Sequence, residues 1–316
     1  LMEFSISVII PVFNGALYIE KAINSAIIQK EVAEIIVVND GSTDNSLQII
    51  EKLQKQDNRI KIYHHQKKLN KGRAASRNLA LKMATQPFLA FLDADDYYLE
   101  NRFLKDKEYF ESDVSNDGVY NAIGVHFYRE ATNNEKEELK LTSLTEVVPY
   151  YELFEFLLNG KKGYFSIDGL TIKNTVIHKI GYFQEHLNVA EDTDWFLKMS
   201  LKCKLVSGNI SEAVAMRGVH DTNIFNQSAQ YKIYRQIMFE SVIKWAFQNK
   251  IAISKIDLLL NWLFYYRFKE NFSFSEETLY WFSLFFKQPK LLTSILAIKY
   301  FPLIRQRKKL FPNLFK

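Results

Sequence analysis

The chain has 316 residues, of which 47% are hydrophobic and 24% are charged, with a formal net charge of +5. This composition is typical of a globular protein rather than a disordered one, and the length allows one large domain with an appendage. Cys203 is the single cysteine, so no internal disulfide can form and we expect a reducing compartment. We expect neither a leader peptide nor a spanning helix, because a strand-like run opens the chain and no uncharged apolar stretch of about 18 residues occurs.

Charge is distributed unevenly along the sequence. Residues 231–316 carry 15 Lys and Arg against 5 Asp and Glu, and they contain 21 of the 46 aromatic residues. The rest of the chain is mildly acidic. This change in composition predicts a boundary near residue 228. We expect one domain over 1–227 and a helical, basic, aromatic-rich region over 228–316.

The first hundred residues alternate between strand and helix patterns. Continuous apolar runs predict buried strands at 7–13, 34–38 and 88–92, with a shorter strand at 59–64. Apolar residues at helical spacing predict helices at 17–27, 47–53 and 73–84. Strands joined by helices of this length form βαβ units, so we expect an α/β fold with a largely parallel sheet.

The pattern is weaker after residue 100. Residues 130–146 are polar and predict a surface excursion. The next expected elements are a strand at 169–172, a short helix at 174–180 that ends at Gly181, and a helix at 191–201. From about 228 the pattern is helical nearly to 297.

Three carboxylates follow the predicted strand at 88–92. Asp93 and Asp95 would alternate along an extended chain and point the same way. At the carboxyl end of a strand in an α/β sheet, such groups face the ligand crevice and suit a hard divalent cation bound to a diphosphate. The alternative is a polar turn in which Asp95 or Asp96 caps the next helix.

Asp40 ends the second predicted strand, directly before Gly41, Ser42 and Thr43. Its carboxylate could accept a hydrogen bond from a base N–H, and the glycine admits close approach of a ligand. The alternative is a turn with Ser42 or Thr43 as the helix cap, which would leave Asp40 free for a ligand. The sequence lacks the glycine-rich fingerprints of dinucleotide and triphosphate loops, and this disfavours both kinds of site.

Two further clusters have both a structural and a functional interpretation. Arg73 and Arg77 lie one helical turn apart, and they could hold phosphate or sugar oxygens or be solvated surface residues. The helix at 191–201 opens with the acids Glu191, Asp192 and Asp194. The helix dipole favours acids there without any catalysis. In the functional interpretation one of them is a general base.

Taken in order, these segments resemble family 2 glycosyltransferases of the GT-A fold. The matching motifs are Pro11-Val12-Phe13-Asn14, Ser25 and Gln29, Val38 to Asp44, Asn70-Lys71-Gly72, Arg77-Asn78, Phe91 to Asp96, and Glu191-Asp192. The resemblance is dense over 5–100, thinner to about 222 and absent beyond. It implies a Rossmann-like, mostly parallel sheet flanked by helices, with a nucleotide-sugar-binding part at 1–100 and an acceptor and catalytic part at 101–227.

The resemblance also implies roles for individual residues. Asp192 matches the general base, and Asp95 would coordinate Mn²⁺ or Mg²⁺. His220, within a segment similar to one that reaches the metal in some relatives, is either a second metal ligand or an ordinary surface histidine. Asp40 would bind the base edge, which indicates uracil, although Asn39 stands where many members have Asp. The donor-binding residues implied are Pro11, Val12, Asn14, Asp40, Asn70, Gly72, Arg77, Asp93 and Ala94.

The expected reaction is an inverting transfer of a hexosyl or N-acetylhexosaminyl group from a UDP-sugar to a hydroxyl of a glycan or lipid-linked glycan, in surface polysaccharide biosynthesis. One base and one metal suffice for a single displacement, whereas a covalent intermediate would need a second carboxylate at the anomeric carbon. Two alternatives remain. A nucleotidyltransferase would need a triphosphate loop, and a sugar-nucleotide-binding module would not need the Glu191-Asp192 pair.

The last 18 residues form a basic, apolar tail. Residues 299–316 contain six Lys and Arg and no acid, interleaved with Phe, Leu and Ile. Each cation near an anionic leaflet contributes about 1 kcal/mol, and interfacial aromatic residues add to this. We therefore expect a cytoplasmic protein held peripherally on the inner face of the cell membrane by 299–316, rather than a nucleic-acid binder. The alternative for this tail is packing on the domain, which we expect for 230–297.

Overall fold

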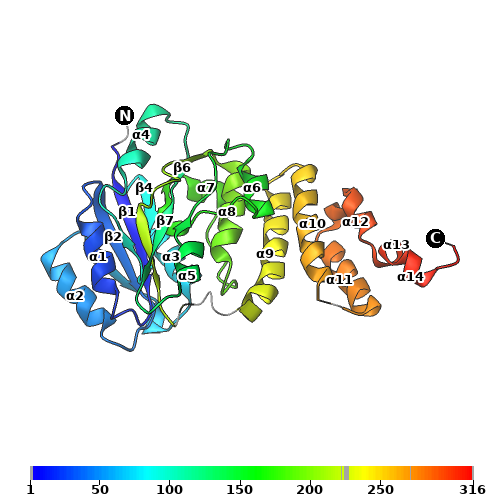
Figure 1. Ribbon diagram of the computed structural model, residues 1–316, viewed down its shortest axis with the longest axis horizontal. Coiled ribbons are helices and arrows are strands. Elements are labelled where there is room, and N and C mark those ends of the chain that lie inside the picture. Colours follow the sequence, from blue (N-terminus) through cyan, green and yellow to red (C-terminus); the bar gives the residue numbers. More distant parts are fainter. Residues whose placement is uncertain (1–2, 222, 224–227, 271, 315–316) are drawn as a thin grey trace. The chain divides into compact units, whose positions relative to one another are not determined.

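The computed structural model describes residues 3–221, 223, 228–270 and 272–314. The chain divides into two compact units, Leu1–Gln227 and Ser228–Lys316, which we call unit 1 and unit 2. Unit 1 contains the α/β fold and every residue that the sequence singled out as a site residue. Unit 2 is helical (Figure 1).

Unit 1 is built on a seven-stranded sheet of order β10-β6-β9-β4-β1-β2-β3. Four of its six strand pairings are parallel, and β9 runs antiparallel to both of its neighbours. The α/β fold expected from the sequence is thus confirmed. The strands are β1 (Ile6–Val12), β2 (Val32–Asn39), β3 (Ile60–His64), β4 (Phe88–Phe91), β6 (Gly118–Tyr120), β9 (Leu170–Lys173) and β10 (Leu205–Ser207).

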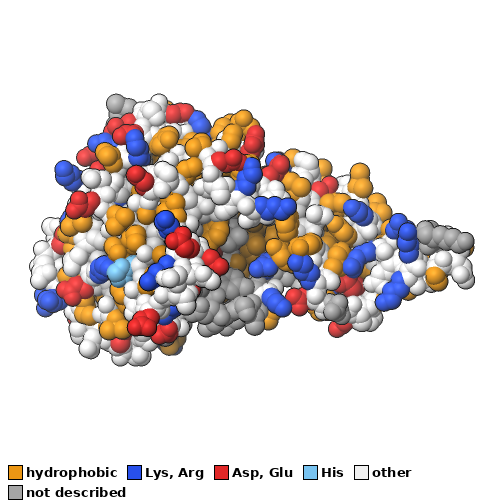
Figure 2. Space-filling model, viewed as in Figure 1, with side chains coloured by type: hydrophobic (Ala, Val, Ile, Leu, Met, Phe, Trp, Pro, Cys, Tyr) orange, Lys and Arg blue, Asp and Glu red, His pale blue; other side chains and the backbone are white. Residues whose placement is uncertain are grey.

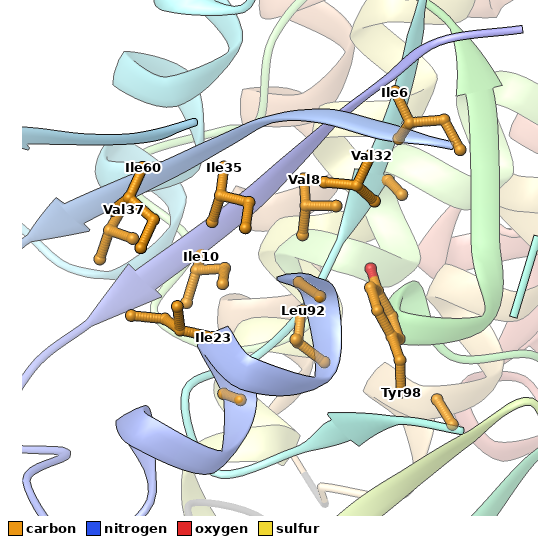
Figure 3. Close-up of a cluster of buried hydrophobic side chains, with 14 of the residues drawn as sticks. Ile6, Val8, Ile10, Ile23, Val32, Ile35, Val37, Ile60, Leu92 and Tyr98 are labelled. Atoms are coloured by element: carbon orange, nitrogen blue, oxygen red, sulfur yellow. The ribbon is translucent and has the colours of Figure 1, made fainter. Parts of the chain in front are cut away.

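The helices between the first strands are α1 (Ile19–Ile27), α2 (Ser46–Gln56) and α3 (Arg73–Met83). All residues of β1 are buried, as a strand covered on both faces requires. Val8 and Ile10 join the hydrophobic cluster that includes Ile23 of α1 (Figure 3). Ile9 alternates with them to the other face and is equally buried, and α3 packs against β1 and β2.

A second, four-stranded sheet of order β5-β11-β7-β8 follows in unit 1. Its strand β11 is antiparallel to β5 and parallel to β7, and it therefore lies close to the acidic segment that precedes β5. The strands are β5 (Tyr97–Tyr98), β7 (Ile123–Phe127), β8 (Leu141–Thr142) and β11 (Ala215–Val219). The remaining helices of unit 1 are α4 (Leu104–Ser112), α5 (Asn133–Glu138), α6 (Leu153–Asn159), α7 (Val176–Ile180) and α8 (Glu191–Lys202), with short 3₁₀ turns at η1 (Gln66–Lys68) and η2 (Ile167–Gly169).

The loops after β1 and β2 are tied to each other. The Asn14 Oδ1 accepts a hydrogen bond from the Thr43 backbone N–H at 2.8 Å, and the Gly15 N–H donates to the Ser46 Oγ at 2.9 Å. Gly41 has a φ of +76°, and a Cβ there would lie 2.7 Å from the Lys68 carbonyl oxygen. Both the conformation and the space therefore require glycine. These contacts fix the carboxyl edge of the sheet.

Unit 2 consists of α9 (Ser228–Gln248), α10 (Ile253–Phe268), α11 (Phe274–Lys287), α12 (Ile295–Lys299), α13 (Pro302–Arg305) and α14 (Arg307–Leu310), with the 3₁₀ turn η4 (Pro289–Thr293). Its core includes Val242 and Ile243 of α9 and Leu259 and Leu260 of α10. Within the described part of the chain, no helix combines the length and apolarity needed to cross a membrane.

Candidate active site

The three acids after β4 lie in a tight turn. The Asp96 N–H donates to the Asp93 carbonyl at 3.1 Å, so the chain reverses there. The expectation that Asp93 and Asp95 alternate along an extended chain is therefore wrong. Instead the two carboxylates face different partners: the Asp93 Oδ1 is 2.5 Å from the Arg77 Nη2, and the Asp95 Oδ2 is 2.9 Å from the His220 Nε2.

Two arginines of α3 join the acidic turn to the start of α8. Arg77 is 1% exposed, and its other terminal nitrogen, Nη1, donates to the Glu191 Oε1 at 2.9 Å. The Arg73 Nε donates to the same oxygen at 2.6 Å. Burial opposes ionisation of Asp93, but the charges of Arg77 and Arg73 hold its pKa below the ordinary value. The interpretation of Arg77 as a solvated surface residue is therefore wrong.

Two polar atoms of this network remain without a protein partner. Among the described residues, the Arg77 Nε and the Glu191 Oε2 are buried and make no hydrogen bond. Buried donors and acceptors are nearly always satisfied in proteins. Each of these two atoms could therefore bond to a water molecule or a polar ligand group.

Asp192 lies half-buried in the first turn of α8. Burial and the neighbouring charge of Glu191 raise its pKa, while the two arginines oppose this shift. Its Oδ1 accepts a hydrogen bond from the Thr193 N–H at 2.7 Å. The preceding residue, Ala190, has a φ of +63°, and backbone strain of this kind concentrates at functional sites. A carboxylate with a raised pKa is suited to accept a proton.

His220 follows β11 and contacts the acidic turn. Besides the contact with Asp95, the Asn223 Nδ2 lies 3.2 Å from the same Asp95 oxygen. The Tyr18 ring stacks on the imidazole with ring centroids 4.9 Å apart. Burial and the charge of Asp93 raise the pKa of Asp95, and the hydrogen bond from His220 opposes the shift. His220 is therefore held in place from several sides, unlike an ordinary surface histidine.

Asp96 is buried and does not cap a helix. Strand β5 follows it, and its Oδ1 accepts the Gly218 N–H at 2.8 Å. The alternative in which Asp96 caps the next helix is therefore wrong, because its carboxylate accepts the backbone N–H of Gly218 in β11 instead. Burial together with the charges of Asp168, Asp95 and Asp93 raises the pKa of Asp96 well above its ordinary value. A Cβ on Gly218 would lie 2.2 Å from the Asp95 carbonyl oxygen, so β11 reaches the turn only with glycine there.

Asp168 was not found from the sequence. It lies in η2, is 2% exposed, and accepts the Asp93 N–H at 2.9 Å and the Ser166 Oγ–H at 2.8 Å. Carboxylate oxygens of Asp93, Asp96 and Asp168 lie within 4.8 Å of one another. The only local signal is one acid beside Gly169 before a strand, and many turns share it.

These oxygen donors, with the His220 imidazole nearby, fit a divalent cation of the Mg²⁺ or Mn²⁺ type, which prefers carboxylate ligands. The turn offers two arrangements. One is the Asp95 and His220 pair that the resemblance implied, and the other is the cluster of three carboxylates. Asp95 does not belong to the cluster.

Asp40 is less free than the sequence indicated. Its two oxygens accept the backbone N–H groups of Lys71 and Gly72 at 2.7 and 2.9 Å. Neither Ser42 nor Thr43 caps α2, because the residue before that helix is Asn45. The expected cap by Ser42 or Thr43 and the expectation that Asp40 is free of protein contacts are therefore wrong. Asp40 is buried and holds the segment before α3 against the end of β2; its Oδ1 also lies 3.5 Å from the His65 Nε2, and its Oδ2 keeps a further lone pair.

The other predicted donor residues lie around the same edge. Pro11 and Val12 end β1 and pair with Val38 and Asn39 of β2. Asn14 is exposed and bonds to Thr43, as described above. The remaining ones are Asn70, which is exposed, Gly72, which precedes α3, and Ala94, which lies within the acidic turn.

Ser25 and Gln29 of the α1 region position the segment after the acidic turn. The Ser25 Oγ accepts the Tyr98 N–H at 3.0 Å. The Gln29 side chain donates to the Leu99 carbonyl at 2.9 Å and accepts the Arg102 N–H at 3.1 Å. These two motif residues therefore have a structural role, because their side chains hold the backbone of residues 98–102 in place.

A mostly parallel sheet with an acidic turn at its carboxyl edge, facing an acid-rich helix start, is the arrangement of a GT-A glycosyltransferase domain. Residues 7–181 match the family described as "Glycosyl transferase family 2". This match covers more than half of the chain, and the chain therefore belongs to glycosyl transferase family 2.

Curated relatives carry the same class of name. An uncharacterized glycosyltransferase of Rickettsia conorii is 29% identical over 278 residues, which cover 86% of this chain and 42% of that protein. An uncharacterized glycosyltransferase of Haemophilus influenzae is 37% identical over 101 residues, which cover 32% of this chain and 40% of the relative. The chain thus spans less than half the length of these relatives.

Solved structures of similar fold include Staphylococcus aureus TarS. The structure of TarS residues 1–349 in complex with UDP has a TM-score of 0.64 at 19% identity, covering 96% of this chain and 91% of that one. The complex of the same fragment with UDP-GlcNAc has a TM-score of 0.57 at 19% identity and covers 96% and 92%. This likeness confirms the GT-A fold.

Proposed function

We propose that the chain catalyses the inverting transfer of a hexosyl or N-acetylhexosaminyl group from a UDP-sugar to a hydroxyl of a glycan or lipid-linked glycan. The observation that supports this most is the buried network from Asp93 through Arg77 to Glu191. It fixes the distance between the acidic turn, where a donor diphosphate would lie, and Asp192, the next residue of α8.

The donor would lie along the carboxyl ends of β1, β2 and β4. Pro11, Val12 and Asp40 would contact the nucleoside, and Asp93 and Arg77 would contact the sugar side. The exposed Asn14 and Asn70, with Gly72 and Ala94, would complete this binding edge. Support for uridine comes from Asp40, whose Oδ2 keeps a lone pair that can accept a base N–H, and from a protein of similar fold that has been solved with UDP and UDP-GlcNAc.

Asp95 and His220 would hold Mn²⁺ or Mg²⁺. When bound, the cation neutralises the negative charge that a leaving diphosphate develops. Their 2.9 Å contact is supported by Asn223 and by the Tyr18 ring, so the two side chains are already gathered. Asp93 and Asp168 fix the backbone beneath them.

Asp192 would act as the general base. Its carboxylate takes the proton of the acceptor hydroxyl while the acceptor oxygen forms a bond to the anomeric carbon. The bond from that carbon to the diphosphate oxygen breaks, and UDP leaves with the electron pair. The configuration inverts because attack and departure occur on opposite faces of the sugar.

The location proposed for this reaction is the inner face of the cell membrane. The support is the composition of 299–316, with six cations and no acid, which favours an anionic surface. A lipid-linked glycan acceptor would be present there.

A thermal-shift comparison of UDP-, GDP- and dTDP-sugars, each with and without Mn²⁺, tests the donor and the metal together. Ligands that bind only the folded state raise the melting temperature with their occupancy. We expect UDP-sugars to stabilise the protein most, and Mn²⁺ to increase this stabilisation. Equal shifts with all three nucleotides, or no effect of Mn²⁺, would contradict the assignment.

A binding module without turnover is distinguished by Asp192→Asn. The base role predicts that this variant keeps its shift with UDP-sugar and loses transfer by about 10²- to 10⁴-fold. Sugar transfer is measured as UDP release with a glycan acceptor. Near-normal release by the variant would refute the role of Asp192.

A further inference from the structure

One face of α11 exposes large apolar side chains. Leu279, Phe282 and Phe286 are 71%, 41% and 81% exposed, and their spacing places them on a single side of the helix. On the other side, Trp281 and Phe285 are buried. A helix packed on one face and facing water on the other would normally carry polar residues on the second face. Here the exposed residues of α11 include these three large apolar ones alongside polar ones such as Ser275 and Ser283.

The same feature continues through the following elements of unit 2. Exposed apolar side chains after α11 include Leu292, Ile295, Ile298, Leu303, Ile304, Leu310, Phe311 and Leu314. Two contacts hold α11 against this segment: the Trp281 indole N–H donates to the Ala297 carbonyl at 3.0 Å, and the Phe282 and Phe301 rings lie 6.1 Å apart. Extended apolar exposure of this kind marks an interaction surface.

The charges of this segment have one sign. Residues 278–316 contain eight Lys and Arg and no Asp or Glu. Of the acids nearby, Glu276 at the start of α11 is exposed and bonds to Ser273, whereas Asp257 is half-buried and Glu277 is buried. Glu277 is 5% exposed and faces Arg305 at 3.1 Å, and Asp257 accepts a hydrogen bond from Ser294. The cations on the outside therefore dominate the local field. Figure 2 shows hydrophobic and Lys or Arg side chains interspersed over this unit on the face in view.

We infer that α11, η4 and α12 together with residues 300–314, here called the α11–α14 surface, bind the surface of an anionic lipid bilayer. Apolar side chains enter the boundary between headgroups and acyl chains, and the cations contact anionic headgroups. Nucleic acid would match the cations but not the eleven exposed apolar side chains. A bilayer interface matches both.

This surface rests on the membrane location proposed above for 299–316 and extends it to α11, η4 and α12, but it does not depend on the transfer chemistry. It also changes the expectation for 278–297, which the sequence assigned to packing. One side of this stretch, which includes Leu284, Phe285 and Leu291, is buried within unit 2, and the other side is exposed. The surface therefore begins at Leu279, about twenty residues before the basic tail.

The test is sedimentation of the 316-residue chain with vesicles of phosphatidylcholine alone or mixed with phosphatidylglycerol. We expect binding to the anionic vesicles only. Leu279→Ser with Phe286→Ser should weaken it at least tenfold, because two apolar anchors are lost. Lys290→Gln, Lys308→Gln and Lys309→Gln together should weaken it further, by about fivefold per cation. All these side chains are exposed, so folding should be retained, as circular dichroism would verify.

Matched controls lie in unit 1. Lys30→Gln, Lys55→Gln and Lys61→Gln make the same change in net charge at exposed positions, and Ile28→Ser with Val114→Ser makes the same change in apolarity. Neither set should alter vesicle binding. Undiminished binding by both unit 2 variants would overturn the inference, as would equal loss with the controls. A stable oligomer that Leu279→Ser with Phe286→Ser converts to monomer would also overturn it, because a second copy would then cover this face.

Discussion

Carboxylates at the edge of the sheet have different proton affinities because their surroundings differ. Asp93 is half-buried beside Arg77 and Arg73, which hold its pKa below the ordinary value. Asp96 is buried beside other acids, and its pKa lies well above the ordinary value. Asp192 lies between these cases, with burial and Glu191 raising its pKa against the arginines. Asp93, with the lowered pKa, therefore keeps its negative charge to lower pH than Asp192. Asp192, with the raised pKa, accepts a proton more readily.

The raised pKa of Asp192 predicts the pH dependence of transfer. The base acts only when ionised, so the rate should fall as the pH decreases through its pKa, at a higher pH than for an ordinary aspartate. The measurement is the pH profile of kcat with saturating UDP-sugar and Mn²⁺. In Asp192→Asn the residual rate should lose this acidic limb. A limb that persists in the variant would assign the titration to another group.

Asp168 shows how a residue without a local signature can position a site. We expect Asp168→Ala to weaken Mn²⁺ binding in the presence of UDP by about tenfold and to lower stability by about 1–3 kcal/mol, because the buried Asp93 N–H loses its acceptor. Asp168→Asn keeps an acceptor oxygen and should recover most of the stability. Mn²⁺ titration followed by melting temperature measures both effects. Equal Mn²⁺ affinity in wild type and Asp168→Ala would contradict this role.

At the scale of elements, α3 and β11 assemble the site from distant parts of the sequence. Arg77 of α3 contacts Glu191 across 114 residues, and Gly218 of β11 contacts Asp96 across 122. Each contact is buried. The site therefore depends on how these elements pack, and not only on the loops after the strands.

Removing the buried cation of α3 should be costly. Arg77→Met leaves Asp93 and Glu191 without their shared partner, and we expect a loss of about 3–5 kcal/mol of unfolding free energy. Urea denaturation measures it. Lys82→Met, at an exposed position of the same helix, should change stability by less than about 1 kcal/mol. Similar losses in both variants would show that the Arg77 network contributes no special stability.

Gly218→Ala tests the approach of β11 to the acidic turn. The added Cβ would overlap the Asp95 carbonyl oxygen, so β11 must shift, and we expect a loss of about 1–3 kcal/mol together with weaker Mn²⁺ binding. Gly160→Ala is the control. Gly160 has a φ of +63° but an added Cβ would meet no atom within 4 Å, so it should lose about 1 kcal/mol and keep its Mn²⁺ affinity. Unchanged Mn²⁺ affinity in Gly218→Ala would contradict the model of a close β11 contact.

At the scale of the whole molecule, the two units differ in charge as well as in fold. Residues 231–316 carry 15 cations against 5 acids, whereas the preceding part is mildly acidic. Unit 1 contains the candidate active site, and unit 2 contains the α11–α14 surface. If both proposals hold, this division would separate sugar transfer in unit 1 from attachment to a bilayer through unit 2.

The charge difference predicts different responses to salt. Raising the ionic strength from about 0.1 M to about 1 M shortens the screening length from about 10 to about 3 Å. Vesicle binding should fall steeply across this range, while the UDP-induced thermal shift should change less, because the proposed donor residues Asp40 and Arg77 are buried. Parallel titrations measure the two. Salt-independent vesicle binding would leave no role for the cations of unit 2.

The sequence by itself determined the strands and helices of residues 1–100, since their apolar patterns are continuous and local. β1, β2, α3 and β4 lie within a few residues of their predicted bounds. It also determined the family and the composition boundary near 228. The contacts of single side chains were predicted less well from the sequence, because a turn such as Asp93 to Asp96 has several possible conformations.

Only the tertiary structure decided which groups meet. Asp168 lies 75 residues from Asp93 in the chain, and neither segment encodes the other. Asp40 was expected to be free, yet the segment before α3 folds back onto it. The exposed face of α11 could not be predicted from its sequence, because large apolar residues occur on both its buried and its exposed side. Contacts between distant segments and the choice of a buried face depend on packing, and packing is a property of the whole fold.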